Sequence, residues 1–299
     1  MDTITEEDLL YPVGLKNTPN APKKLYIKGN KKLLATKIVS IVGSRECSVE
    51  GVRLAEFFSK GLVKQGITIA SGMAIGIDTA AHKYALDAKG GTIAVLPSGL
   101  NKVYPEENEW LYKRILENNG LIITEYKANV DASKQNFLDR NRIVSGIALG
   151  VLIIESKYRS GTSVTAEHAI KQGKKVFALP HEVYNKNGVG NNELIKKGKA
   201  QLVLGIKDIL TELGIEFVKD KENIPEESIK EEKTERVEKI INCPNKTYKR
   251  IYELLQKNQF SIDELYSKLD MSTKKINNLL LMMEIEGYVA KTASGYKFK

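Results

Sequence analysis

Apolar positions in the first two thirds of the chain alternate between short hydrophobic runs and segments with helical spacing. Seven runs rich in Val, Ile and Leu predict buried strands: KIVSIVG, GITIAS, GTIAVLP, GLIITEY, GVLIIES, KKVFALP and AQLVLG. Most segments between them, such as VEGVRLAEFFSKGLVKQ and TAEHAIKQGK, repeat apolar residues at helical intervals. This alternation predicts a doubly wound, mostly parallel α/β sheet with crossover helices on both faces.

The pattern changes after residue 218. Residues 219–243 contain eight acids, six bases and Pro225 but few apolar positions, which predicts a charged linker. Three short amphipathic stretches then precede an alternating tail, YVAKTASGYKF, and together they predict three helices and a hairpin. The expected organisation is an N-terminal extension, a large α/β domain, the linker and a small C-terminal winged-helix domain, at residues 1–36, 37–218, 219–243 and 244–299.

The third predicted C-terminal helix carries the side chains that a winged helix uses to read the major groove. Ser261 with Glu264, and then Ser272, predict the starts of the second and third helices. The candidate DNA contacts on the third helix are Lys274, Lys275, Asn277 and Asn278. Many winged helices bind protein instead, and Glu284 and Glu286 end this helix, so both interpretations stay open.

Charge and composition narrow the class of protein. The net charge is +9, and residues 245–299 carry ten bases against six acids, which favours a polyanion such as nucleic acid or a membrane surface. No run approaches the roughly 20 apolar residues of a membrane span, and MDTITEEDLL does not resemble a secretory signal. Cys47 and Cys243 suggest neither a disulfide framework nor a zinc site, so we expect a cytoplasmic protein.

Small and glycine-rich turns follow several predicted strands. Gly43, Ser44 and Arg45 follow the first strand, and SGMAIGID follows the second. Such turns, placed before helix N-termini, suit phosphate. Neither G-x-G-x-x-G nor G-x-x-x-x-G-K-[ST] occurs, so we predict no nucleotide cofactor. Asp78 could be a general base, but capping of the following helix is the favoured role.

The segment from residue 137 to residue 180 adds a third turn of this kind. Arg140 and Arg142 flank Asn141, and they should point to one region unless a neighbouring carboxylate pairs with one of them. Ser160 and Gly161 then begin another strand-to-helix turn. Three anion-competent turns at one sheet edge suit a chain of phosphates better than a single phosphate. The three histidines, His82, His168 and His181, follow different strands, and His82 and His168, which lie in helical segments, are expected to be packed or surface groups rather than ligands.

Six motifs in order along residues 37–200 resemble the DNA-processing protein A (DprA/Smf) family. They are IVGSR, SGMAIGIDTAAH, GGTIAVLPSGLNKVYP, RNR, SGTSVTAEHA and GNNELIKKG. The resemblance implies a Rossmann-like domain that binds and protects single-stranded DNA and helps to load RecA recombinase during natural transformation. It also implies a homodimer, often with a C-terminal winged helix, and no catalytic activity, cofactor or metal.

The resemblance also assigns roles to individual residues. Phe137 and Tyr158 are candidates for base stacking. Arg45 is expected to grip phosphate, although a pairing with Glu46 or Glu50 is the alternative. The predicted DNA-phosphate contacts are Ser44, Arg45, Ser71, Gly72, Gly76, Arg140, Asn141, Arg142, Ser160, Gly161 and Lys174.

Three positions depart from the pattern of the family. Ile75 stands where the family usually has Arg, Leu138 where it has Pro, and His181 where it has Gly, whereas Lys199 replaces a common Ala. Because a cation is missing at residue 75 and another is added at residue 199, we expect a shifted DNA affinity.

Two other functions compete with DNA protection. Related Rossmann-like hydrolases of the LOG group cleave nucleotide N-glycosidic bonds, and Gly161, Thr162 and Glu167 resemble their motif loosely. The other candidate is a regulator that binds duplex DNA through the winged helix. A preference for single-stranded over duplex DNA, together with a nucleotide hydrolysis assay, separates the three functions.

Overall fold

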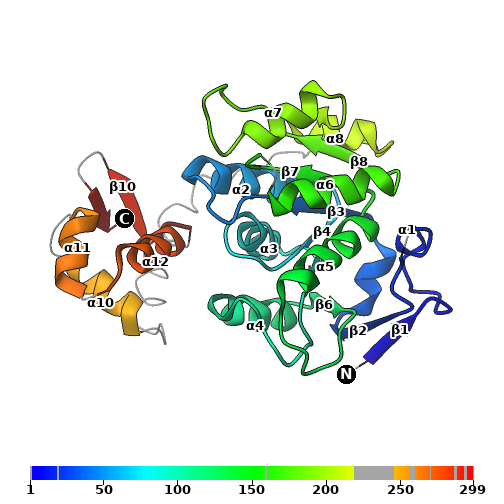
Figure 1. Cartoon of the computed structure of the whole chain (residues 1–299), viewed down its shortest axis with the longest axis horizontal. Coiled ribbons are helices and arrows are strands. Elements are labelled where there is room, and N and C mark those ends of the chain that lie inside the picture. The colour runs from blue at the N-terminus through cyan, green and yellow to red at the C-terminus, as the bar shows by residue number, and fades with distance from the viewer. Residues whose placement is uncertain are drawn as a thin grey trace. The chain divides into compact units, whose positions relative to one another are not determined.

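The computed structural model describes most of the chain as two compact units, Met1–Val218 and Lys219–Lys299 (Figure 1). The described residues are 2–18, 20–158, 160–218, 246–255, 260–269, 271–285, 288–292 and 295–298. The predicted linker, residues 219–243, lies outside them. Within the described parts, no helix has the length and apolar character needed to cross a bilayer.

A single sheet organises the large unit, and its described strands are ordered β1-β2-β6-β5-β4-β3-β7-β8-β9. The strands from β3 to β9 pair in parallel, whereas β1 and β2 are antiparallel to their neighbours. The sheet confirms the doubly wound, mostly parallel fold and all seven predicted strands. Strand bounds are β1 Asp2–Thr5, β2 Lys24–Gly29, β3 Ile38–Val42, β4 Thr68–Ser71, β5 Thr92–Val95, β6 Leu121–Thr124, β7 Gly150–Ile153, β8 Lys175–Ala178 and β9 Gln201–Leu202.

Helices cover both faces of the sheet (Figure 1). Helix α2 packs against α3 and α8, and α5 packs against α1 and α6. Two 3-10 turns, η1 Lys31–Ala35 and η2 Glu106–Asn108, complete the described helical elements of this unit. The α-helices are α1 Val13–Lys16, α2 Val49–Lys64, α3 Ile77–Asp87, α4 Glu109–Glu117, α5 Lys134–Gly146, α6 Gly161–Lys171, α7 Val189–Lys196 and α8 Ile206–Glu212.

Residues 1–36 were expected to form an extension ahead of the large domain, but the structure incorporates them into it. Strand β2 pairs with β6, and β1 pairs with β2. Ile4, Leu25 and Ile27 are buried in the same core as residues from the central strands. Burying a side chain of this size contributes about 1.5–3 kcal/mol, so this segment stabilises the sheet.

The order of the strands creates a switch point between β3 and β7. From β3 the chain builds β4, β5 and β6 on one side, and α5 then returns it to place β7 on the other side. Strands β3 and β7 are parallel, with Val42 opposite Ile153, so the loops that follow them leave the same sheet edge. Ligands of open α/β sheets bind outside the carboxyl ends of the strands at such a point.

The smaller unit consists of three helices and a hairpin in its described part. The elements are α10 Lys246–Leu255, α11 Ile262–Leu269, α12 Thr273–Ile285, β10 Val289–Thr292 and β11 Gly295–Phe298. Ile251, Leu265, Ile276, Leu280 and Val289 form its core. The three-helix and hairpin order confirms the predicted winged helix.

Two hydrogen bonds support the predicted start of α11. The backbone N–H of Ser261 donates to Glu264 Oε2 at 2.7 Å, and the N–H of Glu264 donates to Ser261 Oγ at 3.3 Å. This reciprocal capping box satisfies two backbone donors that a helix N-terminus would otherwise leave unpaired.

Candidate nucleic-acid interface

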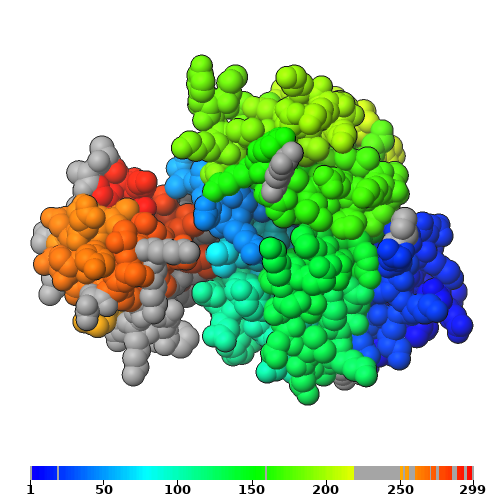
Figure 2. Space-filling view, viewed as in Figure 1, coloured from blue at the N-terminus to red at the C-terminus, as the bar shows by residue number. Residues whose placement is uncertain are grey.

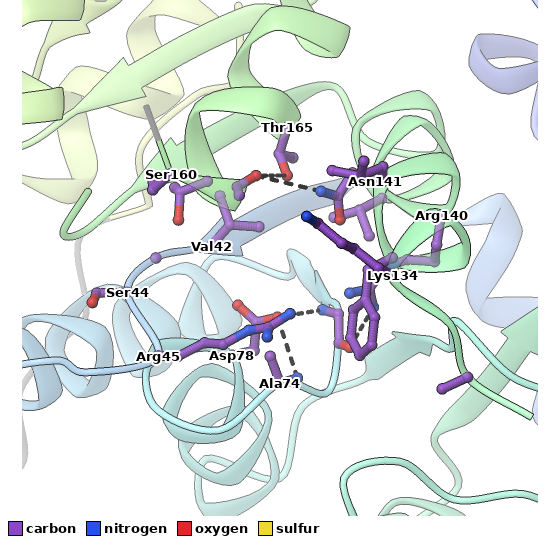
Figure 3. Close-up of a pocket in the computed structure, with 18 of the residues that line it drawn as sticks. Val42, Ser44, Arg45, Ala74, Asp78, Lys134, Arg140, Asn141, Ser160 and Thr165 are labelled. Atoms are coloured by element: carbon purple, nitrogen blue, oxygen red, sulfur yellow. Dashed lines mark hydrogen bonds between the residues drawn. The ribbon is translucent and has the colours of Figure 1, made fainter. Parts of the chain in front are cut away.

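A pocket of about 670 Å³ opens at the switch point of the sheet (Figure 3). Its walls come from the loops after β3, β4, β6 and β7, from one face of α5 and from the first turns of α3 and α6, with a further residue from the loop after β5. Figure 2 shows the chain in space-filling form, with the residues of α5 and α6 in the green part of the colour bar. The predicted convergence of three strand-end turns is therefore present in the structure.

The loop after β3 presents an arginine to the pocket. The guanidinium carbon of Arg45 lies 4.7 Å from the centroid of the Phe137 ring, a cation–π distance. Glu50 lies 4.0 Å from Arg53 and Glu46 pairs with Lys157, so the alternative partners proposed for Arg45 are engaged with other cations.

Ser44, the residue before Arg45, has a different role. It is buried, and its hydroxyl accepts the N–H of Glu46 at 3.1 Å. Ser44 therefore shapes the loop that displays Arg45, while still lining the pocket.

The glycine turn after β4 is held together by its own aspartate. Asp78 Oδ2 accepts the backbone N–H groups of Gly72 at 3.1 Å and Ala74 at 3.4 Å. Asp78 was expected to cap α3, but it caps this preceding turn, because the carboxylate points back from the first turn of α3. Two of the donors that could have met a phosphate are therefore already paired.

Two further predicted contacts in this turn lie outside the pocket lining. The hydroxyl of Ser71 is buried and donates to the carbonyl of Ile41 at 2.7 Å. Gly76 has φ +85°, and a Cβ there would lie 2.4 Å from the carbonyl oxygen of Ser44. Glycine is needed at this position for backbone geometry. The structure thus corrects both assignments to structural roles.

Arg140 forms the floor of the pocket. It is 3% exposed, and Nη1 donates to the carbonyls of Gly72 and Val95, at the ends of β4 and β5. Burial lowers the pKa of Arg140 to about 10, an effect that the nearby Asp78 carboxylate opposes. Burial likewise raises the pKa of Asp78, against the effect of Arg140. The guanidinium remains charged at neutral pH and ties the two strand ends to α5.

One face of α5 supplies most of the remaining wall. Lys134, Phe137, Leu138 and Asn141 follow the i, i+3, i+4, i+7 spacing of a single helix face, and all four line the pocket. The Phe137 ring meets Tyr104 edge to face, with centroids 5.3 Å apart. The sequence analysis missed Lys134 and Tyr104, although the helical spacing from Phe137 would have revealed the lysine.

The start of α6 forms the opposite wall. The N–H of Ser163 donates to Ser160 Oγ at 3.4 Å, and the N–H of Ser160 donates to Ser163 Oγ at 3.2 Å, which makes a capping box. Asn141 Nδ2 donates to the carbonyl of Gly161 at 3.3 Å and thereby links α5 to this turn. Among the described residues, no atom lies within 4 Å of a Cβ built on Gly161, so the backbone here is open to a ligand.

Arg142 and Lys174 do not reach the pocket. Arg142 donates two hydrogen bonds to Glu125, at 2.6 and 3.0 Å, so a neighbouring carboxylate does pair with one arginine of RNR. Lys174 precedes β8 at the amino end of the strand, where its ammonium lies against Gly14, and burial lowers its pKa. Both residues lie outside the pocket lining, and their contacts with DNA phosphate stay predictions.

The remaining predicted residues differ in whether they line the pocket. Tyr158 is exposed on the loop after β7 but does not line the pocket. Ile75 is half-buried and also outside the lining, whereas Leu138 lies within it. Asn277 and Asn278 are exposed on α12, and the side chains of Lys274 and Lys275 lie outside the described structure.

His82 and His168 are buried and half-buried groups, as expected. His82 is fully buried with Nδ1 2.7 Å from Thr92 Oγ1, and burial lowers its pKa to about 3, so it is neutral. The pKa of half-buried His168 is also lowered by burial. His181 places Nε2 2.7 Å from the carbonyl of Ile154 and thereby attaches the loop after β8 to the end of β7.

The fold and the pocket define a class of protein: a doubly wound α/β domain with a basic strand-end pocket, followed by a winged helix. Residues 2–214 match the family DNA recombination-mediator protein A, and residues 243–295 match the DprA winged helix domain. The chain therefore belongs to the DprA/Smf family.

Individual relatives agree with this membership. The chain is 34% identical to Protein Smf of Escherichia coli, over 98% of this chain and 76% of the relative. It is 41% identical to DNA processing protein DprA of Streptococcus pneumoniae, over 69% and 72% of the two chains. The name of the Streptococcus pneumoniae relative describes it as a DNA processing protein.

Solved structures show the same fold. The X-ray structure of DprA from Streptococcus pneumoniae matches with a TM-score of 0.68 and 38% identity, covering 73% of this chain and 75% of the other. DprA from Helicobacter pylori, whose structure was solved to examine its mode of binding single-stranded DNA, matches with a TM-score of 0.63 and 34% identity over 71% and 95% of the chains.

Proposed function

We propose that the strand-end pocket binds the sugar-phosphate backbone of single-stranded DNA. The observation that carries this function is the convergence of Arg45, Lys134 and Lys157 with the open N-terminus of α6 at Gly161. Charged side chains and helix N-termini both favour phosphate. These groups come from three separate elements, so they can meet successive phosphates of a flexible chain.

The aromatic pair in the pocket favours a single strand over a duplex. Phe137 and Tyr104 meet edge to face, and Tyr104 is 46% exposed. An unpaired base can stack on an aromatic ring with little dependence on sequence, whereas a base inside a duplex already has its faces covered. The related Helicobacter pylori protein, which binds single-stranded DNA, supports the same choice of ligand.

We propose the finer activities from family membership. In this proposal the protein protects incoming DNA and helps to load RecA recombinase in natural transformation. It works as a cytoplasmic homodimer without catalytic activity, and RecA and a second copy of the chain are its protein partners. Co-sedimentation with RecA and light scattering test these two partners separately from DNA binding.

The hydrolase alternative receives little support from the pocket. Glu167, the acid that resembled the LOG motif, is exposed on α6 and does not line the pocket. The two acids that do line it are Asp78, which bonds the glycine turn, and Glu46, which pairs with Lys157. A nucleotide hydrolysis assay tests this alternative directly.

Fluorescence anisotropy with matched single-stranded and duplex oligonucleotides tests the proposed function. We expect tighter binding to single strands, little base preference and a strong dependence on salt concentration. A second arm uses residues 1–218, to separate the pocket from the winged helix. Equal or tighter binding of duplex by residues 1–218 would contradict the proposal, whereas duplex binding that needs the C-terminal unit would identify a duplex-reading winged helix.

A further inference from the structure

An acidic side chain lies at the pocket among the cations. Glu46 Oε2 is 2.6 Å from Nζ of Lys157, and both residues line the pocket. Glu46 follows Arg45 on the loop after β3, whereas Lys157 belongs to the loop after β7. The ion pair therefore joins the two loops that flank the switch point.

The backbone of Glu46 is held in place, although its side chain is exposed. Its N–H donates to Ser44 Oγ at 3.1 Å, and its carbonyl accepts from Asn187 Nδ2 at 3.1 Å. The side chains of Glu46 and Lys157 are 77% and 45% exposed. The carboxylate is thus anchored beside the pocket by its backbone, and its ion pair with Lys157 is open to solvent.

We propose that Glu46 competes with DNA phosphate for Lys157 and so limits the affinity of the pocket. This inference rests on the proposed function of the same pocket. The only other acid in the described lining, Asp78, is buried and bonded to backbone N–H groups and lies near Arg140. Glu46 is therefore the carboxylate that an arriving phosphate meets.

The strength of the pair fits a competitor that DNA can displace. Exposed ion pairs are weak because water and salt screen them. A phosphate can replace the carboxylate at Lys157. Glu46 must then take up a cation from the solvent, and this uptake offsets part of the counterion release that drives DNA binding. With its affinity lowered in this way, the pocket can still bind DNA and can also release it.

Replacing Glu46 with Gln tests the inference, because the amide keeps the size of the side chain and removes its charge. We expect E46Q to bind single-stranded oligonucleotide about two- to fivefold more tightly at low salt, the range that exposed ion pairs imply. The slope of log K against log salt should steepen by up to about 0.7, because Lys157 then neutralises one more phosphate. The two proteins should converge in affinity at high salt.

The matched control is E212Q, which makes the same change in net charge at the opposite edge of the sheet. Glu212 pairs with Lys175 at 3.0 Å, and Lys175 begins β8 at the amino end of the strand. We expect E212Q to bind as wild type does. In the K157Q background, E46Q should tighten binding less than it does in wild type, since the lysine is no longer there to be released.

The outcomes separate this inference from the proposed function. If wild type prefers single strands but E46Q binds no more tightly than E212Q, Glu46 does not compete with phosphate. The same conclusion follows if E46Q gives an equal gain with and without Lys157. If wild type binds no single-stranded DNA, the proposed function fails and this inference fails with it. Trp110, the one tryptophan of the chain, reports by its fluorescence whether each variant retains a folded large unit.

Discussion

The two edges of the large sheet both carry basic side chains, and the strand-end pocket lies at the carboxyl edge. At that edge Arg45 is exposed above Phe137, and Lys134 lines the same pocket. At the amino edge Lys174 is half-buried against α1, and Lys175 pairs with Glu212. Positive charge by itself therefore does not identify a binding site in this chain.

The direction of the crossover helices explains the difference. Helices α2 and α6 begin at the carboxyl edge, where their N-termini carry a partial positive charge. Ser48 caps α2 and donates to the Glu155 carboxylate, and the capping box of Ser160 and Ser163 caps α6. They end near the amino edge, where Lys64 and Lys171 lie in the last turns and complement the partial negative charge of the carbonyls. At the carboxyl edge, the charge of the cations adds to the partial positive charge of the helix N-termini, and both favour an anion. At the amino edge, the cations are compensated by the partial negative charge of the helix C-termini and by side chains of the protein.

Replacing Arg140 with Ala should produce the largest effect, because it removes the floor of the carboxyl edge. Losing one member of a buried charged pair costs about 3–5 kcal/mol of stability, and Asp78 and the carbonyls of Gly72 and Val95 would all lose their partner. Urea unfolding followed by the fluorescence of Trp110 measures the stability of the large unit. The double variant Arg140→Met with Asp78→Asn should recover part of the loss.

A small change in stability for Arg140→Ala, combined with a large loss of DNA affinity, would contradict this structural role. In that case Arg140 would be a direct phosphate contact, as the family resemblance first implied.

Replacing Arg45 with Ala should weaken single-strand binding about tenfold, the effect of losing about 1.4 kcal/mol from a hydrogen bond to a charged group. The loss should be similar for all base sequences. The slope of log K against log salt should flatten by about 0.7, since one fewer phosphate is neutralised. Arg45→Lys should keep the slope but regain only part of the affinity, because lysine lacks the planar fork that matches phosphate.

An unchanged salt slope for Arg45→Ala, with a lowered unfolding midpoint, would show that Arg45 only steadies its loop. The carboxyl edge would then lose its principal exposed cation, and the contrast between the two edges would weaken.

Replacing Phe137 with Ala should weaken binding about fivefold, near the lower end of the roughly 1–3 kcal/mol measured for a stacked base. The lower end applies because Arg45 already covers part of the ring. The salt slope should stay unchanged, since no charge is removed. Anisotropy titrations at several salt concentrations separate this pattern from that of Arg45→Ala, and Phe137→Tyr serves as the control that keeps the ring.

The sheet could be predicted from the sequence more completely than the pocket. Strands β3 to β8 appear as continuous apolar runs because both faces of the central sheet are buried, whereas both residues of the edge strand β9 are exposed. The short strands β1 and β2 were missed, because only their pairing with the distant β6 shows that Ile4, Leu25 and Ile27 belong to the core.

The turns of the pocket could be predicted from the sequence, but the direction of each side chain could not. Arg140 and Arg142 were expected to point to one region, yet residues two apart on a helix lie roughly 200° apart around its axis. Arg140 therefore faces the strand ends, while Arg142 faces Glu125. Once this segment was known to be helical, the same geometry would have placed Lys134 beside Phe137.

Replacing Lys174 or Lys175 with Gln should produce the smallest effect, a change of less than about twofold in single-strand affinity, as expected for substitutions worth no more than roughly 0.5 kcal/mol. Lys175 pairs with Glu212 at 3.0 Å, and Lys174 is half-buried against α1, so we expect neither lysine to pair with a DNA phosphate. The salt slope should match wild type, because no phosphate contact is lost. The same titrations used for Arg45→Ala check this. A loss at Lys174 as large as that at Arg45 would place the amino edge on the DNA path and break the contrast between the two edges.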